Sequence, residues 1–207
     1  MNFITIEGIE GVGKTTAMKF AESFFQTHKK DFILTREPGG TAIAEQIRQI
    51  LLTPETTVEA ITANTELLLM FAARAQHIQY VIKPALQTGK WVISDRYVDA
   101  SFAYQGGGRG ISENTIAFLE EWIVADILPV ATIILDAPAE IGLARAKNRS
   151  AHDRIEQEKV DFFVRVREAY LMHARKNPHR YYIIDATKPL ESVEQALIQV
   201  FTKVVLK

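Results

Sequence analysis

Short apolar runs alternate along the chain with longer stretches in which apolar residues recur at helical spacing. Five of the runs contain two or more β-branched or aromatic residues and little alternation, which is typical of strands covered on both faces. They span residues 3–7, 32–35, 91–94, 132–136 and 181–185. The helical stretches span residues 14–28, 41–52, 64–88, 112–125, 138–148, 157–176 and 189–205. This alternation predicts an α/β fold around a parallel sheet.

The third helical stretch contains Pro84, which should kink the helix or change its direction. The chain has 207 residues and shows no internal repeat or low-complexity tract. That length suits one compact domain, so we predict a single α/β domain.

Positive and negative side chains are balanced, with 24 Lys and Arg against 25 Asp and Glu. A formal charge of −1 gives no overall attraction to nucleic acid or an anionic membrane, so we expect neither as a partner and expect anion sites built from local groups. The absence of cysteine excludes disulfides, thiolate metal sites and thiol nucleophiles. We find no apolar run long enough to span a membrane and no secretory signal, which predicts a cytoplasmic protein.

Residues 8–15 fit the pattern G-x-x-x-x-G-K-[S/T] and lie between the first predicted strand and the first predicted helix. Glycines in such a turn let successive N–H groups point at an anion at the positive end of the helix. Lys14 is expected to meet the β and γ phosphates of a nucleotide, and the Thr15 hydroxyl to ligate Mg²⁺. The predicted ATP phosphate-binding residues are Gly8, Gly11, Gly13, Lys14, Thr15 and Thr16.

The phosphate loop does not identify the reaction by itself, because GTPases, motor ATPases and small-molecule kinases share it. The chain has no Asn-Lys-x-Asp segment of the kind that reads guanine, and it is too short for the partner domains of a large ATPase. A small-molecule kinase is therefore the favoured class. The alternative from another class is a nucleotide-binding switch that reports its occupancy to a partner protein.

Two further polar segments follow the second and third predicted strands, at residues 35–41 and 94–97. The carboxyl ends of parallel strands face the ligand crevice, so both segments should lie beside the phosphate loop. Asp95 is placed to hold Mg²⁺ directly or through water, and Arg96 is placed to bind a second phosphate. A surface salt bridge between these two side chains is the alternative.

Together these segments resemble bacterial thymidylate kinases, from residue 3 to about residue 185. The resemblance rests on the phosphate loop and on residues 36–41, 71–76, 95–97, 103–110 and 153–156. It implies transfer of the γ-phosphoryl group of ATP to dTMP, giving dTDP and ADP, with Mg²⁺ as cofactor and a homodimer as the assembly. The implied fold is a three-layer P-loop kinase with a five-stranded parallel sheet of order 2-3-1-4-5. Another nucleoside-monophosphate kinase is the nearest alternative.

The resemblance also implies a set of dTMP contacts. Arg74 matches an arginine that donates to thymine O4, which disfavours cytosine because its N4 is itself a donor. Tyr104 matches a tyrosine that packs against the sugar and leaves little room for a 2′-hydroxyl, and Glu10 matches a carboxylate near the 3′-hydroxyl. The predicted dTMP-binding residues are Glu10, Arg48, Phe71, Arg74, Arg96, Ser101, Tyr104 and Gln105.

One position departs from the family pattern. A base-stacking phenylalanine commonly lies four residues before the arginine, where this chain has Met70, and Phe71 lies three residues before it. Offsets of three and four share a helix face, so we expect Phe71 to stack on the base. The alternative is that both side chains belong to the core.

A basic segment at about 145–156 is predicted to form a mobile lid. The dTMP phosphate has a second pKa near ~6 and is already mostly dianionic at neutral pH, so the transfer needs cations rather than a general base. Family members differ in whether an arginine lies in the phosphate loop, and this loop has none. Arg149 is our first choice for the missing cation, with Arg145, Lys147 and Arg154 as alternatives. The predicted catalytic residues are Lys14, Arg96, Arg149 and Glu10, and the predicted metal ligands are Thr15 and Asp95.

We assign no chemical role to two features of the sequence. The five histidines show no metal-ligand spacing. Residues 106–108 are three consecutive glycines that follow Gln105, which the resemblance places in the site, and the alternative is a flexible loop with no ligand.

Overall fold

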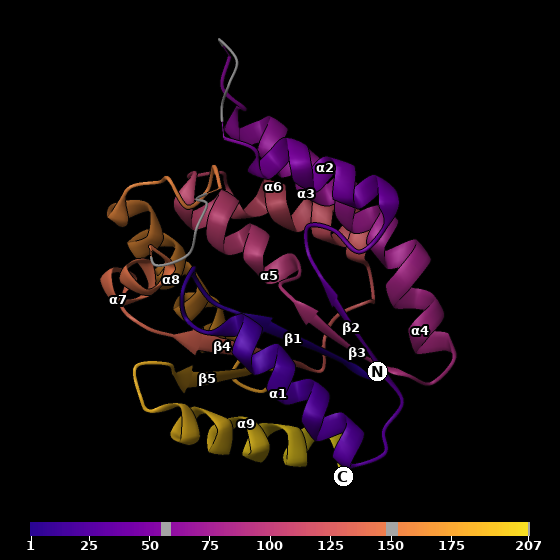
Figure 1. The fold of residues 1–207 in the computed structure, drawn as a ribbon. Coiled ribbons are helices and arrows are strands. Elements are labelled where there is room, and N and C mark those ends of the chain that lie inside the picture. Colours follow the sequence, from indigo (N-terminus) through magenta and orange to yellow (C-terminus); the bar gives the residue numbers. More distant parts are fainter. Residues whose placement is uncertain (55–58, 148–152, 207) are drawn as a thin grey trace.

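The structure is a computed structural model that describes residues 1–54, 59–147 and 153–206. Figure 1 shows a central sheet with helices on both faces. The strands are β1 (Phe3–Glu7), β2 (Phe32–Arg36), β3 (Trp91–Asp95), β4 (Ala131–Asp136) and β5 (Tyr181–Asp185). All neighbouring strands are parallel and the order is β2-β3-β1-β4-β5, so the predicted three-layer fold and strand order are confirmed.

The helices fall close to the predicted stretches, with one exception. The described ones are α1 (Lys14–Thr27), α2 (Ala42–Leu52), α3 (Ala63–His77), η1 (Ile78–Ile82), α4 (Lys83–Gln87), α5 (Val98–Ser101), η2 (Phe102–Gly108), α6 (Glu113–Leu119), η3 (Glu120–Val124), α7 (Ala139–Ala146), α8 (Val160–Lys176) and α9 (Leu190–Val205), where η marks π-helical turns. Helices α1 and α9 lie together on one face of the sheet in Figure 1, and α3, α4 and α8 lie on the other.

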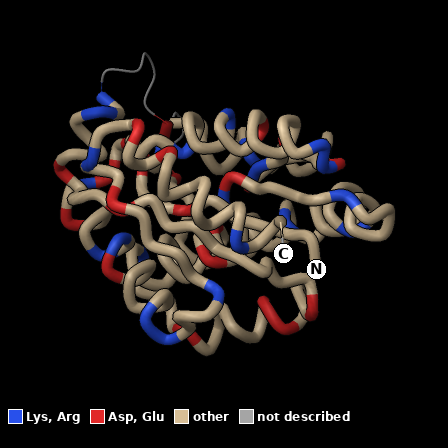
Figure 2. The backbone as a smooth tube through the Cα atoms, turned by 90° about the horizontal axis from the view of Figure 1, so that it is seen from below, with Lys and Arg blue, Asp and Glu red and all other residues tan. Residues whose placement is uncertain are grey.

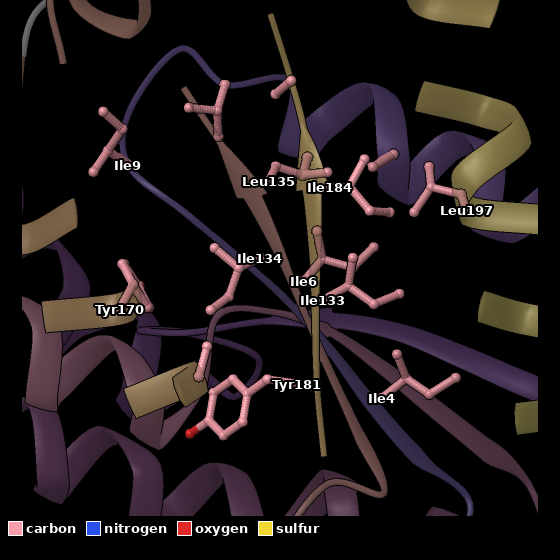
Figure 3. Close-up of a cluster of buried hydrophobic side chains, with 14 of the residues drawn as sticks. Ile4, Ile6, Ile9, Ile133, Ile134, Leu135, Tyr170, Tyr181, Ile184 and Leu197 are labelled. Atoms are coloured by element: carbon pink, nitrogen blue, oxygen red, sulfur yellow. The ribbon is translucent and has the colours of Figure 1, made fainter. Parts of the chain in front are cut away.

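Both faces of the central strands β1, β3 and β4 are mostly buried, so these strands have no polar, solvent-facing side. Side chains alternate along a strand, so Phe3 and Ile4 of β1 point to opposite faces. Phe3 packs in a buried cluster with Phe71 of α3, whereas Ile4 belongs to a second cluster that includes Phe201 of α9. Figure 3 shows part of this second cluster, with isoleucines of β1 and β4 beside Leu197 of α9.

The alternative of a flexible loop at the three glycines is not what the structure has, because residues 98–108 form the short helix α5 and the π-helix η2. This segment packs closely on α8. A Cβ atom on Gly107 would lie 2.6 Å from Ala169 Cβ, and one on Gly108 would lie 2.5 Å from the Phe162 ring. The glycines therefore permit a close approach between two helices, a requirement that their sequence does not reveal.

The chain changes its helical geometry immediately before Pro84. The π-helical turn η1 separates α3 from α4, and Pro84 is the second residue of α4. A proline inside a helix cannot donate to the carbonyl four residues earlier and its ring crowds that carbonyl, and a wider turn relieves both problems. The predicted change in the helix at Pro84 is thus present as a π-helical insertion.

Charged residues are interspersed over the helices rather than gathered by sign, as Figure 2 shows. Strong local charge must therefore come from side chains at particular places in the fold. Within residues 1–54, 59–147 and 153–206, we find no helix that is both long and apolar enough to cross a bilayer.

Candidate active site

The loop between β1 and α1 turns on three glycines with left-handed backbone angles. Gly8, Gly11 and Gly13 have φ values of 133°, 74° and 99°, which side chains disfavour. Gly13 directly precedes α1, so Lys14 and Thr15 stand in the first helical turn. The backbone N–H groups of this turn have no partners inside the helix and present the positive end of its dipole. This geometry is that of a phosphate-binding loop.

The loop lies directly against α7. A Cβ atom on Gly11 would be 1.8 Å from the carbonyl oxygen of Gly142, and one on Gly142 would be 2.5 Å from the carbonyl oxygen of Glu10. Only glycine allows both backbones to come this close. The helix that precedes the predicted lid is therefore in contact with the phosphate loop.

Lys14 folds back over the loop. Its Nζ atom donates to the carbonyl oxygens of Gly8 at 3.1 Å and Ile9 at 2.8 Å. Burial, and next the positive charge of Arg96, lower the pKa of Lys14 to about 8. The ammonium group is thus held where an anion would relieve an unfavourable burial of positive charge.

A cavity of about 530 Å³ opens beside the loop. It brings together most of the predicted site residues from five separate parts of the chain. Those that line it are Glu10, Gly11, Gly13, Lys14, Thr15, Thr16, Arg48, Arg74, Asp95, Arg96, Ser101, Tyr104 and Gln105. Gly8 and Phe71 are not among its lining residues.

Arg96 links the phosphate loop to the substrate side of the cavity. Its guanidinium donates to the carbonyl oxygen of Gly8 and to Glu10 Oε1, each at 2.8 Å, and lies over the Tyr104 ring. The Tyr104 hydroxyl also donates to Glu10, at 2.8 Å. Arg96 has a φ of 71°, a strained backbone angle for a side chain of this size. Three predicted residues therefore form one ion-paired cluster at the cavity wall.

Glu7, which the sequence analysis did not select, supports this cluster from below. Its carboxylate accepts hydrogen bonds from the Tyr97 amide and the Tyr170 hydroxyl, both at 2.7 Å. The Tyr170 hydroxyl is itself 3.3 Å from a guanidinium nitrogen of Arg96. Burial, and then the nearby Asp99 carboxylate, raise the pKa of Glu7. The position of Glu7 at the end of the mostly apolar strand β1 was the sequence signal that could have found it.

Arg74 is a buried residue of the cavity wall. It donates to Glu37 Oε2 at 2.8 Å, to the Ser101 hydroxyl at 3.1 Å and to the Tyr97 carbonyl oxygen at 3.1 Å. An arginine side chain has five N–H donors, so the remaining donors of Arg74 are free to meet an acceptor in the cavity.

Glu37 and His77 hold Arg74 in place, and the sequence analysis gave neither a role. His77 Nδ1 lies 2.9 Å from Glu37 Oε1, and His77 Nε2 lies 2.6 Å from the Thr35 hydroxyl. Both Glu37 and His77 are buried. Glu37 lies within residues 36–41, directly after the second strand, and this position was a usable sequence signal. No spacing in the sequence joins His77 to it.

Phe71 and Met70 take different positions. The Phe71 side chain is buried in the core, with its ring 4.6 Å below the Arg74 guanidinium carbon. Met70 lines the cavity instead. The residue four positions before Arg74 therefore faces the site, while the residue three positions before it supports the arginine from the core.

Asp95 fits the predicted metal site. Its Oδ1 atom is the one buried side-chain oxygen or nitrogen without a hydrogen-bond partner in the described parts of the chain. An unpaired buried carboxylate oxygen is costly unless a cation or water meets it, and Mg²⁺ prefers such oxygens. Thr15 lies in the same cavity wall. No group of three or more His, Cys, Asp or Glu side chains gathers as a metal cluster within the described ranges. Magnesium bound with substrate phosphates needs only one or two protein carboxylates.

The basic segment divides into parts with different contacts. Arg149 lies outside the described residues. Arg145 lines the cavity and donates to the Ala186 carbonyl oxygen at 2.8 Å. Arg154 is buried against Glu66 at 2.6 Å and does not line this cavity. Lys147, the third alternative, is exposed and does not line this cavity either, so Arg145 is the alternative lid cation that does.

The parallel sheet of this order, the phosphate loop and the guanidinium groups around a cavity large enough for nucleotides define a P-loop phosphotransferase. The family model described as thymidylate kinase matches residues 6–197. The chain belongs to the thymidylate kinase family.

Relatives and a solved structure agree with that membership. The chain is 51% identical over 195 residues to a thymidylate kinase of Pseudomonas putida, covering 94% of this chain and 93% of that one. It is 49% identical over 198 residues to one of Alcanivorax borkumensis, covering 96% and 94%. The crystal structure of thymidylate kinase from Ehrlichia chaffeensis superposes with a TM-score of 0.76 at 34% identity, covering 97% of each chain. The chain is therefore a nucleoside-monophosphate kinase, and the alternative of a non-catalytic switch is set aside.

Proposed function

We propose that this cavity transfers the γ-phosphoryl group of ATP to dTMP, giving dTDP and ADP. The observation that carries the assignment is the presence of two unlike groups of residues in the wall of one cavity. One group is the phosphate loop with Lys14, and the other is the buried Arg74 with Ser101 and Gln105. A phosphate donor and a pyrimidine acceptor fit these two groups respectively.

Further residues of the cavity align the two nucleotides for transfer. Lys14 and the loop amides bind the donor phosphates, while Arg96 and Arg48 bind the acceptor phosphate. Arg48 is fixed by a bond to the Pro38 carbonyl oxygen at 2.9 Å. Glu10 and Tyr104, joined at 2.8 Å, define the sugar site. Because the acceptor phosphate is already dianionic, these residues act by charge and position rather than by removing a proton.

Magnesium is the proposed cofactor, held by Asp95 and Thr15. When bound, it supplies positive charge that offsets the charge building up on the phosphate oxygens. Lys14 and Arg96, which both donate to the Gly8 carbonyl oxygen, contribute the same kind of stabilisation from neighbouring positions in the cavity wall.

We assign the adenine of ATP to a smaller adjoining cavity of about 200 Å³. Thr16, Arg145, Ala186 and Val193 are among the residues that line it. It shares Gly13, Thr16 and Arg145 with the larger cavity, so a nucleotide whose phosphates sit on the loop can reach it.

The remaining cation is proposed to come from the lid at about 145–156, with Arg149 as its carrier. A lid that closes over both nucleotides also excludes water and prevents futile hydrolysis of ATP. An Arg149→Ala variant should keep its affinity for dTMP and lose turnover by about 10²- to 10³-fold. Stopped-flow binding and steady-state rates separate the two, and unchanged turnover would transfer the role to Arg145 or Lys147.

We propose a homodimer formed through the helices farthest from α1 and α9. Large apolar side chains are more than half exposed there: Ile50 of α2, Leu68 of α3, Tyr80 of η1, Phe118 of α6 and Trp122 of η3. Large exposed apolar side chains on neighbouring helices are characteristic of a protein interface. The cytoplasm is the proposed compartment, because the substrates are formed and consumed there.

The proposed reaction is tested by ADP release in a coupled assay, with ATP and Mg²⁺ and with dTMP, dUMP, dCMP, UMP or AMP as acceptor. We expect the highest kcat/KM for dTMP and the lowest values for dCMP and AMP. The Lys14→Met variant serves as the control for contaminating kinases. A preference for dCMP or UMP would overturn the proposed acceptor.

A further inference from the structure

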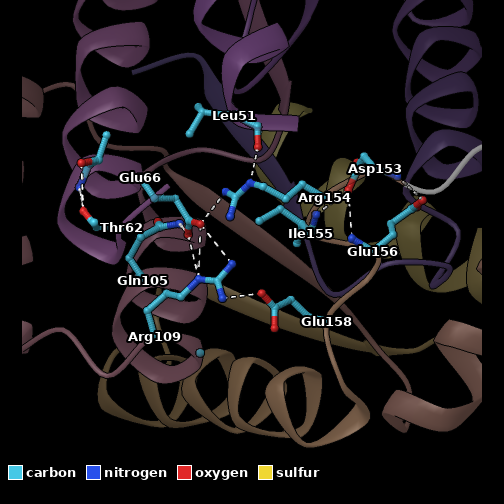
Figure 4. A network of polar contacts seen from close by, with 12 residues as sticks. Leu51, Thr62, Glu66, Gln105, Arg109, Asp153, Arg154, Ile155, Glu156 and Glu158 are labelled. Atoms are coloured by element: carbon cyan, nitrogen blue, oxygen red, sulfur yellow. Dashed lines mark hydrogen bonds and ion pairs between the residues drawn. The ribbon is translucent and has the colours of Figure 1, made fainter. Parts of the chain in front are cut away.

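Glu66 is a fully buried carboxylate on α3 that neither the sequence analysis nor the proposed transfer uses. It accepts hydrogen bonds from three side chains, which come from η2, the turn after η2 and the segment at 153–156. Gln105 Nε2 donates to its Oε1 at 2.8 Å, Arg154 to its Oε2 at 2.6 Å and Arg109 to its Oε2 at 3.0 Å. Figure 4 shows Glu66 at the centre of this network.

Glu66 remains ionised in this setting. Burial by itself would raise its pKa, but the hydrogen bonds from Arg109, Gln105 and Arg154 outweigh burial and hold the pKa below its usual value. An ionised carboxylate accepts hydrogen bonds and cannot donate them. The partner atom of Gln105 must therefore be its amide nitrogen.

The orientation of the Gln105 amide follows from that contact. Its nitrogen points to Glu66, so its carbonyl oxygen Oε1 lies on the other side of the amide plane. In the described part of the chain, no side-chain hydrogen bond reaches Oε1, and Oε1 is not among the buried atoms that lack a partner. Because Gln105 lines the large cavity, Oε1 is the polar atom that it presents there.

We propose that Glu66 is a positioning residue for base selection, which fixes Gln105 with its carbonyl oxygen toward the acceptor base. This inference rests on the proposed placement of dTMP in the cavity. An acceptor at this position pairs with the N3–H donor of thymine and opposes the bare N3 acceptor of cytosine. Arg74 reads the neighbouring exocyclic position, so the two residues would select thymine over cytosine by separate contacts.

The rest of the network keeps Glu66 itself from turning. Arg154 is anchored to α2 by a bond from its Nε to the Leu51 carbonyl oxygen at 2.8 Å, and Arg109 is paired with Glu158. The shortest bonds of both arginines go to Oε2, whereas the shortest bond to Oε1 comes from Gln105. Arg109 Nε adds a longer contact of 3.3 Å to each oxygen. The backbone of η2 is fixed in turn by its close packing on α8.

This arrangement gives a directional test with Glu66→Gln. The arginines should keep the single remaining oxygen at the Oε2 position, which places the new amide nitrogen beside Gln105. Gln105 must then accept from it, and its own NH₂ group turns toward the base. We expect kcat/KM for dTMP relative to 5-methyl-dCMP to fall about tenfold, mainly through KM, which is the effect of one reversed hydrogen bond.

The choice of 5-methyl-dCMP matters, because it differs from dTMP only at the edge that Gln105 and Arg74 read. Arg109→Met is the matched control: it removes another partner of Glu66 and leaves the Gln105 contact intact. This control should lower the melting temperature and leave the substrate ratio unchanged. An equal fall in the ratio of kcat/KM for dTMP to that for 5-methyl-dCMP in Glu66→Gln and Arg109→Met would indicate a merely structural role for Glu66 and overturn the inference.

Loss of the Glu66 charge leaves Arg154 buried without an anion, so a second variant guards against unfolding. Glu66→Gln with Arg154→Met removes that cation and retains Arg109 to hold the oxygen. It should show the same tenfold change in ratio relative to Arg154→Met alone. An unchanged ratio in this folded pair would equally overturn the inference.

The proposed site is tested separately with Gln105→Met. If this variant keeps its KM for dTMP, Gln105 does not contact the base and the proposed placement of dTMP fails. If its KM rises and the Glu66 variants keep their substrate ratio, the placement stands and the orienting role of Glu66 alone is wrong.

Discussion

At the scale of single residues, the site depends on charges that are buried before any ligand arrives. Lys14, Arg74 and Arg96 each spend part of their hydrogen-bonding capacity on the protein itself, through the Gly8, Glu37 and Glu10 contacts respectively. Such contacts fix the direction of a cation in advance, so less freedom is lost when an anion binds. The direction of each cation therefore depends on its partner.

The lowered pKa of Lys14 gives a pH dependence. With a pKa of about 8 in the ligand-free protein, Lys14 is charged below that pH and becomes neutral as the pH rises through it. We expect the affinity for Mg–ATP to fall between pH 7 and pH 9, measured by calorimetry. In Lys14→Met the affinity should be lower at both values and lack this decline. An equal decline in the variant would assign it to another group.

The lowered pKa of Lys14 also makes the free energy of unfolding depend on pH. The folded pKa of Lys14 lies below its unfolded value of 10.5, so the unfolded chain binds the additional proton between about pH 8 and 10.5. The contribution of Lys14 to the free energy of unfolding therefore rises with pH across that window. Below it the cost of burying the charge is fully present, and phosphate binding offsets this cost.

Arg74 is expected to contribute to stability and to recognition by separable routes. Arg74→Met leaves Glu37 buried without its main cation, which should lower the free energy of unfolding by about 3–5 kcal/mol. Denaturant unfolding of the double variant Arg74→Met with Glu37→Met should recover most of this loss. Activity with dTMP should stay low in both variants. Recovery of activity in the double variant would show that Arg74 is only structural.

At the scale of elements, the close approach of η2 to α8 positions Tyr104 and Gln105. A Cβ atom on Gly107 would also lie 2.9 Å from the Arg165 carbonyl oxygen, which is backbone and cannot turn aside. A Cβ atom on the neighbouring Gly106 would meet the flexible Ile116 side chain at 3.2 Å, and the backbone oxygens of Ile111 and Ser101 would be at ordinary contact distances of 3.9 and 4.0 Å. Two adjacent glycines in one helix thus face very different surroundings.

This difference predicts opposite outcomes for two alanine substitutions. Gly107→Ala should lower the free energy of unfolding by about 1–3 kcal/mol and raise KM for dTMP, because η2 must shift. Gly106→Ala should change stability by no more than about 1 kcal/mol, since alanine favours helix. Thermal melts and steady-state kinetics measure both effects. Similar behaviour of the two variants would mean that contact with α8 does not constrain the segment.

At the scale of the whole molecule, the site is assembled where the carboxyl ends of β1, β2 and β3 meet. The phosphate loop follows β1, the Glu37 segment follows β2 and Asp95 ends β3. A parallel sheet brings these ends together whatever their separation in the chain. The exposed apolar side chains of the proposed interface do not line the cavity, so that surface is separate from the chemistry.

That surface carries the prediction about assembly. Trp122 is 70% exposed and Phe118 is 64% exposed, and replacement of either by aspartate should place a charge in the proposed interface. Sedimentation should then show a shift from dimer to monomer. Leu190→Asp, at a 57% exposed apolar residue of α9, is the control and should leave the dimer intact. A wild-type chain that sediments as a monomer at micromolar concentration would contradict the homodimer.

The sequence predicted the candidate site in part. Thirteen of the residues that it selected line one cavity, because the resemblance and the strand-end rule both act on recognisable local motifs. Glu7, Glu37, His77 and Glu66 were missed. Each is a polar residue whose partner lies far away in the chain, so only the folded structure shows that it is paired.

The amino-acid sequence alone determined the kind and order of the elements, the phosphate loop and the family to which the chain belongs. These follow from periodicity and from turn geometry, which act over a few residues. Tertiary structure decided that the three glycines lie in a helix, that Met70 rather than Phe71 faces the cavity, and that Glu66 binds Gln105. Such choices depend on which helices pack together and how closely, and neighbours along the chain do not encode that information.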